Sequence, residues 1–179
     1  LRYECVTNAS RCRFRFKMAQ KLCNYRVMKS EDTQSWPTVE ERQLIRASFL
    51  RLIPSWEGLN DHLYASIFRD HAEVQALFAG DMERQKEKLT LMLASAVDLL
   101  DDVSGFQTLC RECGARHVGY GALPGHYPVV LGFLVQGLAD LEDPKLSGPE
   151  AAAWTKFAQL VVREMLIGAD QTNPAPPQA

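Results

Sequence analysis

The sequence predicts an all-α fold of about seven helices of unequal length. From Pro37 onward, apolar residues recur at intervals of three and four, which is the period of an amphipathic helix. No alternating strand pattern and no internal repeat occurs, and capping residues, glycines and prolines divide the chain at short intervals. Unequal helices joined by short links favour helices that cross at steep angles around a pocket.

The first two helices have clear start and stop signals. Thr38 and Glu41 form a capping box, and Pro54 ends the helix that follows. Ser55 is expected to cap the second helix. Its apolar stripe consists of Leu59, Leu63 and Ile67, with Tyr64 and Phe68 beside it.

The middle of the chain predicts a short helical turn over Glu73–Leu77 and then a long helix. Ala79-Gly80 is a helix breaker, and Asp81 begins an amphipathic segment that runs to Leu99 or Leu100. The polar positions of this segment include Gln85 and Lys88.

Three further helices follow. Ser104 with Gln107 is expected to cap the first of them, and Pro128 falls in the first turn of the second. Ser147 and Glu150 form another capping box before the last helix, whose apolar positions are Trp154, Phe157, Val161 and Met165.

One histidine lies at the end of an apolar helical stripe. Phe106, Leu109, Cys113 and His117 share one helix face, which stops at Gly119 and Gly121. Such a histidine is either a hydrogen-bonded core residue or a ligand. Spacing alone favours the core residue.

Composition fits one globular domain with extensions at both ends. The chain has 179 residues, 46% of them hydrophobic and 23% charged. We expect residues 37–170 to form the domain, residues 171–179 a disordered tail, and residues 1–36 a basic extension outside the fold. A natural start at Met28 would make residues 1–27 an extension without functional consequence.

Charge and hydropathy exclude several classes of function. Eight of the 20 Lys and Arg residues lie in residues 1–30 against Glu4 alone, so the rest of the chain is acidic. An acidic body argues against nucleic-acid binding, which depends on clustered cations. Neither an apolar run of eighteen residues nor a signal-like segment occurs, so we expect a cytoplasmic protein without a membrane span.

The five cysteines do not predict a disulfide framework. Cys110 and Cys113 match C-x-x-C, but no second pair completes a zinc site and Gly114 stands where haem attachment needs histidine. We interpret both as small apolar packing residues.

Four short segments in order resemble the bacterial single-domain globins and the globin domain of flavohaemoglobins. They are Leu63-Tyr64, Leu77-Phe78, residues 81–89 (DMERQKEKL), and Arg116-His117-Val118 followed by His126-Tyr127-Pro128. The resemblance covers about Pro37 to Gly168. It implies a globin-like fold of about seven helices around a haem pocket.

The resemblance also implies a cofactor and its site. Haem b would be bound with His117 as the proximal iron ligand, its second ring nitrogen donating to a backbone carbonyl, that of Cys113 being one turn earlier. His62, His71 and His126 are the competing histidines. Further haem-binding positions are Phe78, Gln85, Lys88, Leu89, Tyr127 and Val130.

The opposite face of the haem would bind the gas. The family pattern places Tyr64, Gln85 and Leu89 there, so a phenol and an amide would stabilise bound dioxygen while Leu89 keeps the site dry. Without the family pattern, Tyr64 is an ordinary helix tyrosine and Gln85 a surface residue.

One position departs from the family pattern. Tyr127 matches the tyrosine of a proximal histidine-tyrosine-glutamate triad, but the position expected to carry the glutamate is Ala169, and Asp170 is one residue off. This weakens a peroxidase-like interpretation.

The primary hypothesis is reversible dioxygen binding, as storage or transport, by a monomer or homodimer that also binds NO or CO. The alternative is nitric oxide dioxygenation with an external reductase. A haem-based sensor and a cofactor-free helical interaction module are the remaining hypotheses.

Overall fold

The computed structural model describes residues 36–78, 80–141 and 145–172. Within these ranges there are six α-helices of 14 to 25 residues, one single-turn α-helix, two short 3-10 turns and no strand. The helices are α2 (Val39–Leu52), α3 (Trp56–Asp70), α4 (Ala72–Gln75), α5 (Met82–Asp98), α6 (Val103–Gly119), α7 (His126–Leu141) and α8 (Gly148–Thr172), and the 3-10 turns are η1 (Ile53–Ser55) and η2 (Leu99–Asp101). The prediction of an all-α fold is confirmed.

Three of the predicted helix starts are confirmed by their hydrogen bonds. At α2, the Glu41 amide donates to Thr38 Oγ1 over 3.2 Å and the Thr38 amide donates to Glu41 Oε2 over 2.7 Å. Asp81 Oδ1 accepts from two amides of the first turn of α5. The Ser147–Glu150 box is also formed. These side chains satisfy amides that would otherwise have no helical partner.

Two predicted caps lack the expected side-chain hydrogen bond to the helix. Ser55 precedes α3, but its side chain makes no capping hydrogen bond, because the 3-10 turn that contains Pro54 leads directly into the helix. Asp102 caps α6 in place of Ser104: its Oδ1 accepts from the Gly105 amide over 3.0 Å and from the Ser104 hydroxyl over 2.9 Å. A carboxylate at a helix N-terminus also interacts favourably with the helix dipole, which favours Asp102.

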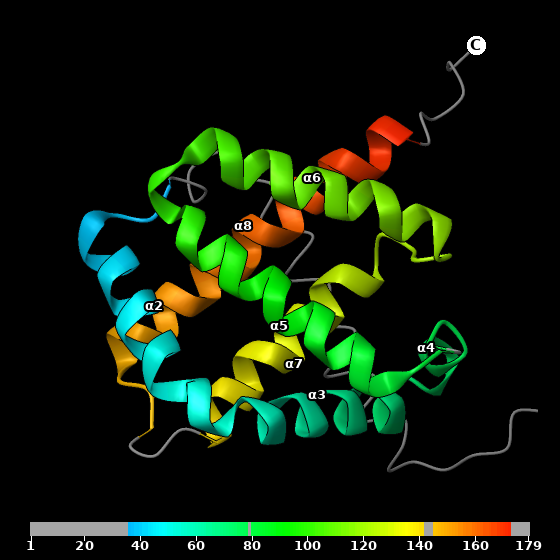
Figure 1. Ribbon diagram of the computed structural model, residues 1–179, viewed down its shortest axis with the longest axis horizontal. Helices are drawn as coiled ribbons and strands as arrows, with labels where there is room; N and C mark the ends of the chain where they lie inside the picture. Colours follow the sequence, from blue (N-terminus) through cyan, green and yellow to red (C-terminus); the bar gives the residue numbers. More distant parts are fainter. Residues whose placement is uncertain (1–35, 79, 142–144, 173–179) are drawn as a thin grey trace, which may run out of the picture. The chain divides into compact units, whose positions relative to one another are not determined.

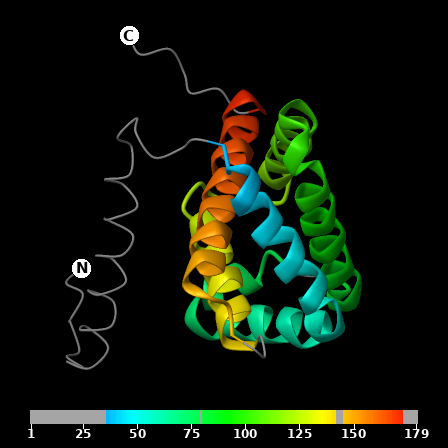
Figure 2. The same cartoon turned by 90° about the vertical axis from the view of Figure 1, so that its left-hand side faces the viewer.

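The packing is organised around α8, which lies against α6, α7 and α2 (Figures 1 and 2). Its buried face includes Trp154, Phe157 and Val161, each at most 1% exposed. α3 packs against α7 (Figure 1). None of the described helices combines the length and the apolar character needed to cross a bilayer.

α6 and α8 approach each other through two glycines. A Cβ added to Gly114 would lie 1.9 Å from the Met165 carbonyl oxygen, and one added to Gly168 would lie 2.0 Å from that of Arg111. Backbone occupies both positions, so no side chain can be accommodated without moving a helix. These two close contacts therefore fix the position of α6, the helix that carries His117, relative to α8.

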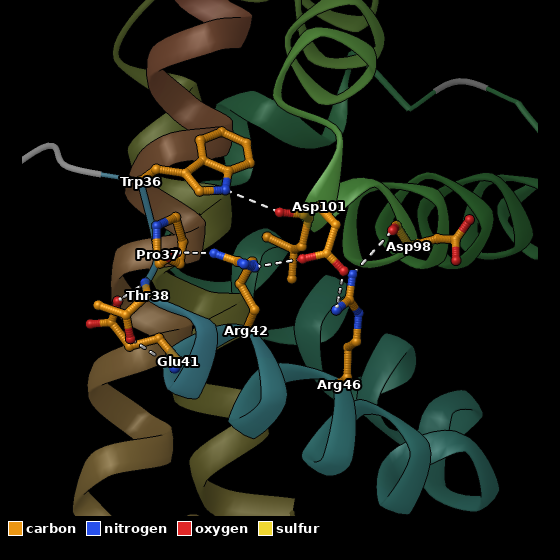
Figure 3. Close-up of polar contacts among 9 residues, drawn as sticks. Trp36, Pro37, Thr38, Glu41, Arg42, Arg46, Asp98 and Asp101 are labelled. Carbon is orange, nitrogen blue, oxygen red and sulfur yellow. Dashed lines mark hydrogen bonds and ion pairs between the residues drawn. The ribbon is translucent and has the colours of Figure 1, made fainter.

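Trp36, the first described residue, packs against the helices. Trp36, which the sequence assigns to the extension, donates from Nε1 to the Leu100 carbonyl over 3.0 Å (Figure 3). Its ring also packs edge-on against Phe106. Arg42 and Arg46 bind the Asp101 carboxylate over 2.7 and 2.8 Å. These contacts join the start of α2 to η2, which connects α5 to α6, and to α6 itself.

The expectations for the two ends of the chain lie mostly outside the described residues. Residues 1–35 and 173–179 are in this category, and with them Cys5, Cys12, Cys23 and Met28. α8 continues to Thr172, two residues beyond the expected end of the domain.

Candidate functional site

His117 lies in the last turns of α6 with its two ring nitrogens in different environments. Nδ1 is 2.7 Å from the Cys113 carbonyl oxygen, and because a carbonyl can only accept, Nδ1 carries the proton. Among the described residues, Nε2 makes no hydrogen bond. Burial lowers the pKa of His117, although the bond to Cys113 opposes the shift. The side chain therefore presents a neutral imidazole with a free electron pair on Nε2.

Two tyrosine rings pack against this imidazole. The Tyr127 ring centroid lies 5.9 Å and that of Tyr120 5.6 Å from the imidazole centroid. Tyr127 is 5% exposed, and its hydroxyl donates to the Gly114 carbonyl over 3.4 Å. Burial raises the pKa of Tyr127, with additional contributions from Cys113 and Asp170. We call His117, Tyr120 and Tyr127 the histidine side.

Cys110 and Cys113 are packing residues, as interpreted from the sequence. Both are free and buried, with exposures of 0% and 8%. Burial raises the pKa of Cys110 to about 12, and it raises that of Cys113 as well, so both thiols stay protonated. Within the described residues, no cluster of three or more metal-ligating side chains occurs.

Tyr64, Phe78 and Gln85 meet on a second group of elements, which we call the tyrosine side. Tyr64 is a buried residue of α3, and its ring packs edge-on against Phe78 at 5.5 Å. Burial raises the pKa of Tyr64, while a hydrogen bond with Gln85 of α5 lowers it to a smaller extent. The phenol is therefore protonated at neutral pH and lies beside the Gln85 amide.

Polar contacts that the sequence did not predict join α3 to α5 beside this pair. Asn60, one turn before Tyr64, donates from Nδ2 to Thr90 Oγ1 over 3.0 Å. Lys86, next to Gln85, forms an ion pair with Asp61 over 2.5 Å. The available sequence signal was the spacing of Asn60 and Tyr64, because residues four apart share a helix face.

The remaining predicted residues occupy more open positions. Leu89 of α5 and Val130 of α7 are half-buried. Lys88 is exposed, and among the described residues it forms no ion pair. Their assignment to the site stays a prediction.

The other histidines are engaged elsewhere or exposed. His126 Nδ1 accepts from the Leu123 amide over 3.1 Å at the start of α7. His71 Nδ1 lies 3.2 Å from the Glu73 carboxylate, and His62 is exposed on α3. His117 and His71 are both half-buried, and among the described residues neither Nε2 has a hydrogen-bond partner; His117 differs from His71 in that its Nδ1 donates to a backbone carbonyl one turn earlier in its own helix.

The two sides lie on helices that diverge from a common corner. α5 and α6 are joined through η2, and the ends that carry Gln85 and His117 are the ends far from this corner (Figure 1). Gly121, which has a φ of +81° and therefore requires glycine, follows α6; a Cβ there would lie 3.5 Å from Leu77. The turn after His117 thus approaches the segment that leads to Phe78.

A family model described as Globin matches residues 61–165. The chain belongs to the globin family. The match includes Tyr64, Phe78, Gln85 and His117, and thus both sides of the site.

Relatives of this globin include proteins more than twice its length. It is 29% identical over 140 residues to a flavohemoprotein of Pseudomonas putida, a match covering 74% of this chain and 34% of the relative. A flavohemoprotein of Burkholderia sp. is 24% identical over 75% of this chain and 35% of the relative. The chain therefore spans about a third of the length of these curated relatives.

A solved structure has the same fold. The bacterial globin from Campylobacter jejuni superposes with a TM-score of 0.65 at 20% identity and covers 75% of this chain and 97% of its own. The superposition covers nearly all of that globin, so the globin fold accounts for most of the described residues of this chain.

Globin family membership implies haem binding, and the donor chemistry of the histidine side fits that group. An imidazole that binds haem iron must be neutral, and its second N–H almost always has an acceptor. His117 meets both conditions, since burial disfavours its charged form and the Cys113 carbonyl accepts from Nδ1.

Proposed function

We propose that this globin binds haem b through His117 and reversibly binds dioxygen at the ferrous iron. The observation that carries the proposal is the state of His117, a half-buried imidazole with a lowered pKa, its Nδ1 hydrogen-bonded to Cys113 and its Nε2 available. Haem supplies the iron at which a diatomic gas binds. The chain holds the imidazole in the required tautomer and orientation.

The tyrosine side supplies hydrogen bonds to the gas. Dioxygen on ferrous iron has partial negative charge, which O–H and N–H donors stabilise. The Tyr64 phenol stays protonated because burial raises its pKa, and Gln85 adds an amide beside it. Phe78 would pack at the haem edge and Leu89 would exclude water, so we expect slow release of dioxygen.

The first experiment tests haem uptake and ligation. Purified protein should take up haemin and show a Soret band that shifts with dithionite and CO. His117→Ala should lose the CO spectrum of a histidine-ligated haem, whereas His62→Ala, which removes an exposed histidine of α3, should retain it. Protein that takes up no haemin would instead support the cofactor-free helical module.

The second experiment tests the role of Tyr64. Tyr64→Phe should raise the dioxygen dissociation rate about tenfold or more, because a hydrogen bond to a charged group is worth about 1.5–3 kcal/mol. Tyr120→Phe removes the same hydroxyl on the histidine side, where the side chain is 60% exposed, and should change the rate little. Equal rates in wild type and Tyr64→Phe would refute the role of Tyr64.

The proximity of the Tyr64 phenol to the Gln85 amide also favours a second candidate function, nitric oxide dioxygenation. Nitric oxide, dioxygen and one electron give nitrate, so each turnover requires an electron from an external reductase. Stoichiometric nitrate from the oxygenated protein and turnover with a reductase would support it. The absence of nitrate would exclude it.

A further inference from the structure

We propose that Asn60 is a positioning residue that holds α3 against α5 and thereby sets how Tyr64 meets Gln85. The inference deepens the proposed function and rests on it, because its consequence is measured on the gas-binding face. It assigns a role to a buried polar side chain that neither packing nor the family pattern explains.

The contacts of Asn60 join the helices that carry the two donors. Its Nδ2 donates to Thr90 Oγ1 over 3.0 Å and approaches the Lys86 carbonyl oxygen at 3.5 Å. Asn60 precedes Tyr64 by one helical turn, and Lys86 directly follows Gln85. A shift of α5 relative to α3 that breaks these contacts would therefore also displace Gln85 from Tyr64.

The direction of the hydrogen bonds requires a hydrogen-bond donor at position 60. The Thr90 hydroxyl donates to the Lys86 carbonyl over 3.0 Å, so its oxygen is left to accept from Asn60. An ionised carboxylate at position 60 would have no proton to donate to either acceptor. The junction thus selects a donor on α3.

The buried amide of Asn60 reduces the stability of the folded state. Asn60 is 4% exposed, and within the described residues its Oδ1 has no hydrogen-bond partner. A buried unpartnered acceptor destabilises the folded state, whereas an apolar residue of similar shape would carry no such cost. Core groups that reduce stability are expected where function requires them.

The exposed ion pair between the same helices does not replace this contact. Lys86 Nζ binds Asp61 Oδ1, whose side chain is 58% exposed, and Glu83 Oε1, whose side chain is 72% exposed. Salt and water screen such pairs, and long side chains bridge a range of helix separations. The short Asn60–Thr90 contact allows less variation in the distance between α3 and α5.

The test compares Asn60→Leu and Thr90→Val with wild type in the haem-loaded, full-length protein. Both variants remove the contact with side chains of similar volume, and Thr90→Ser preserves the acceptor. The readouts are the C–O stretching frequency of the CO complex, the dioxygen dissociation rate, amide hydrogen exchange at residues 86–90 and the unfolding midpoint in guanidinium.

A structural control comes from a buried hydrogen bond between other helices. Trp154 Nε1 donates to Ser48 Oγ over 2.7 Å, joining α8 to α2. Ser48→Ala should lower the unfolding midpoint without moving the C–O stretch. A shift equal to that of Asn60→Leu would assign the effect to general loosening and overturn the proposal.

We expect Asn60→Leu and Thr90→Val to shift the C–O stretch, speed exchange at residues 86–90 and raise the dioxygen dissociation rate about three- to tenfold, the equivalent of one neutral hydrogen bond. Asn60→Leu should leave the unfolding midpoint near that of wild type, and Thr90→Ser should retain wild-type behaviour. In a Tyr64→Phe, Gln85→Leu background, Asn60→Leu should have no further effect on the dissociation rate.

The outcomes separate this inference from the proposed function. If Tyr64→Phe changes the stretch and the rate while Asn60→Leu and Thr90→Val change neither, the positioning role is wrong and the proposed function stands. If Tyr64→Phe also changes neither, the gas-binding role of the tyrosine side fails as well.

Discussion

The two sides of the site are held in place by different means. On the histidine side, α6 meets α8 backbone to backbone at Gly114 and Gly168. On the tyrosine side, α3 meets α5 through side chains, in the Tyr64–Gln85 and Asn60–Thr90 contacts. The first junction leaves no space for adjustment, whereas the second can change when a single hydrogen bond is removed.

This difference matches what each side is proposed to do. A metal ligand must stay at one distance and orientation, which a packed backbone enforces. Hydrogen bonds to a gas set its release rate, and exchanging side chains on α3 and α5 tunes that rate without rebuilding the helix crossing. Substitutions at the two junctions should therefore have different effects.

The largest effect is expected at the glycine crossing. Gly114→Ala places a Cβ against the Met165 carbonyl and should destabilise the fold by about 3 kcal/mol or more, because backbone cannot move aside as a side chain can. Gly132→Ala is the matched control: no atom lies within 4 Å of its added Cβ, and alanine is the better helix former. Denaturant unfolding of the two variants measures the contrast, and equal midpoints would refute the packing argument.

A smaller effect is expected at the ion pair beside that crossing. Glu164 of α8 is 1% exposed and binds Arg111 of α6 over 2.8 Å and Arg163 over 2.7 Å. Arg111→Met removes one of these partners from a buried carboxylate and should cost about 2 kcal/mol of unfolding free energy. Lys86→Met, which removes an exposed pair on the tyrosine side, should cost far less, with a loss that diminishes at high salt. A larger loss for Lys86→Met would reverse the comparison.

The smallest effect concerns the pH at which haem is retained. A protonated imidazole has no electron pair for iron, so acid should release haem. Burial lowers the pKa of His117 from the ordinary 6.5, so the neutral form persists to lower pH, and the Soret band should begin to fall only below about pH 6.5. A pH titration of Soret absorbance measures this, and haem loss beginning above pH 6.5 would contradict the burial argument.

Much of the fold could be predicted because its signals are local. The Thr38–Glu41 box, the Asp81 cap and the period of α8 each depend on residues a few positions apart. The choice between Asp102 and Ser104 was missed because both suit an N-cap and only the path of the chain from η2 distinguishes them.

For the candidate site, the family pattern names Tyr64, Gln85 and His117, and their roles stay predictions; the structure brings Tyr64 and Gln85 together. The Nδ1 bond of His117 to the Cys113 carbonyl, expected together with the resemblance, is confirmed. Gly114, Glu164 and Asn60 were missed because their roles depend on a partner helix far away in sequence. A glycine inside a helix and a polar residue one turn before Tyr64 were the signals available.

The most direct test of the account is the iron–histidine stretching band in the resonance Raman spectrum of the ferrous protein. The account predicts a band that shifts when ⁵⁷Fe replaces natural iron, disappears in His117→Gly and returns when imidazole is added to that variant. An unchanged band in His117→Gly without added imidazole would show that another residue binds the iron and would contradict the central claim.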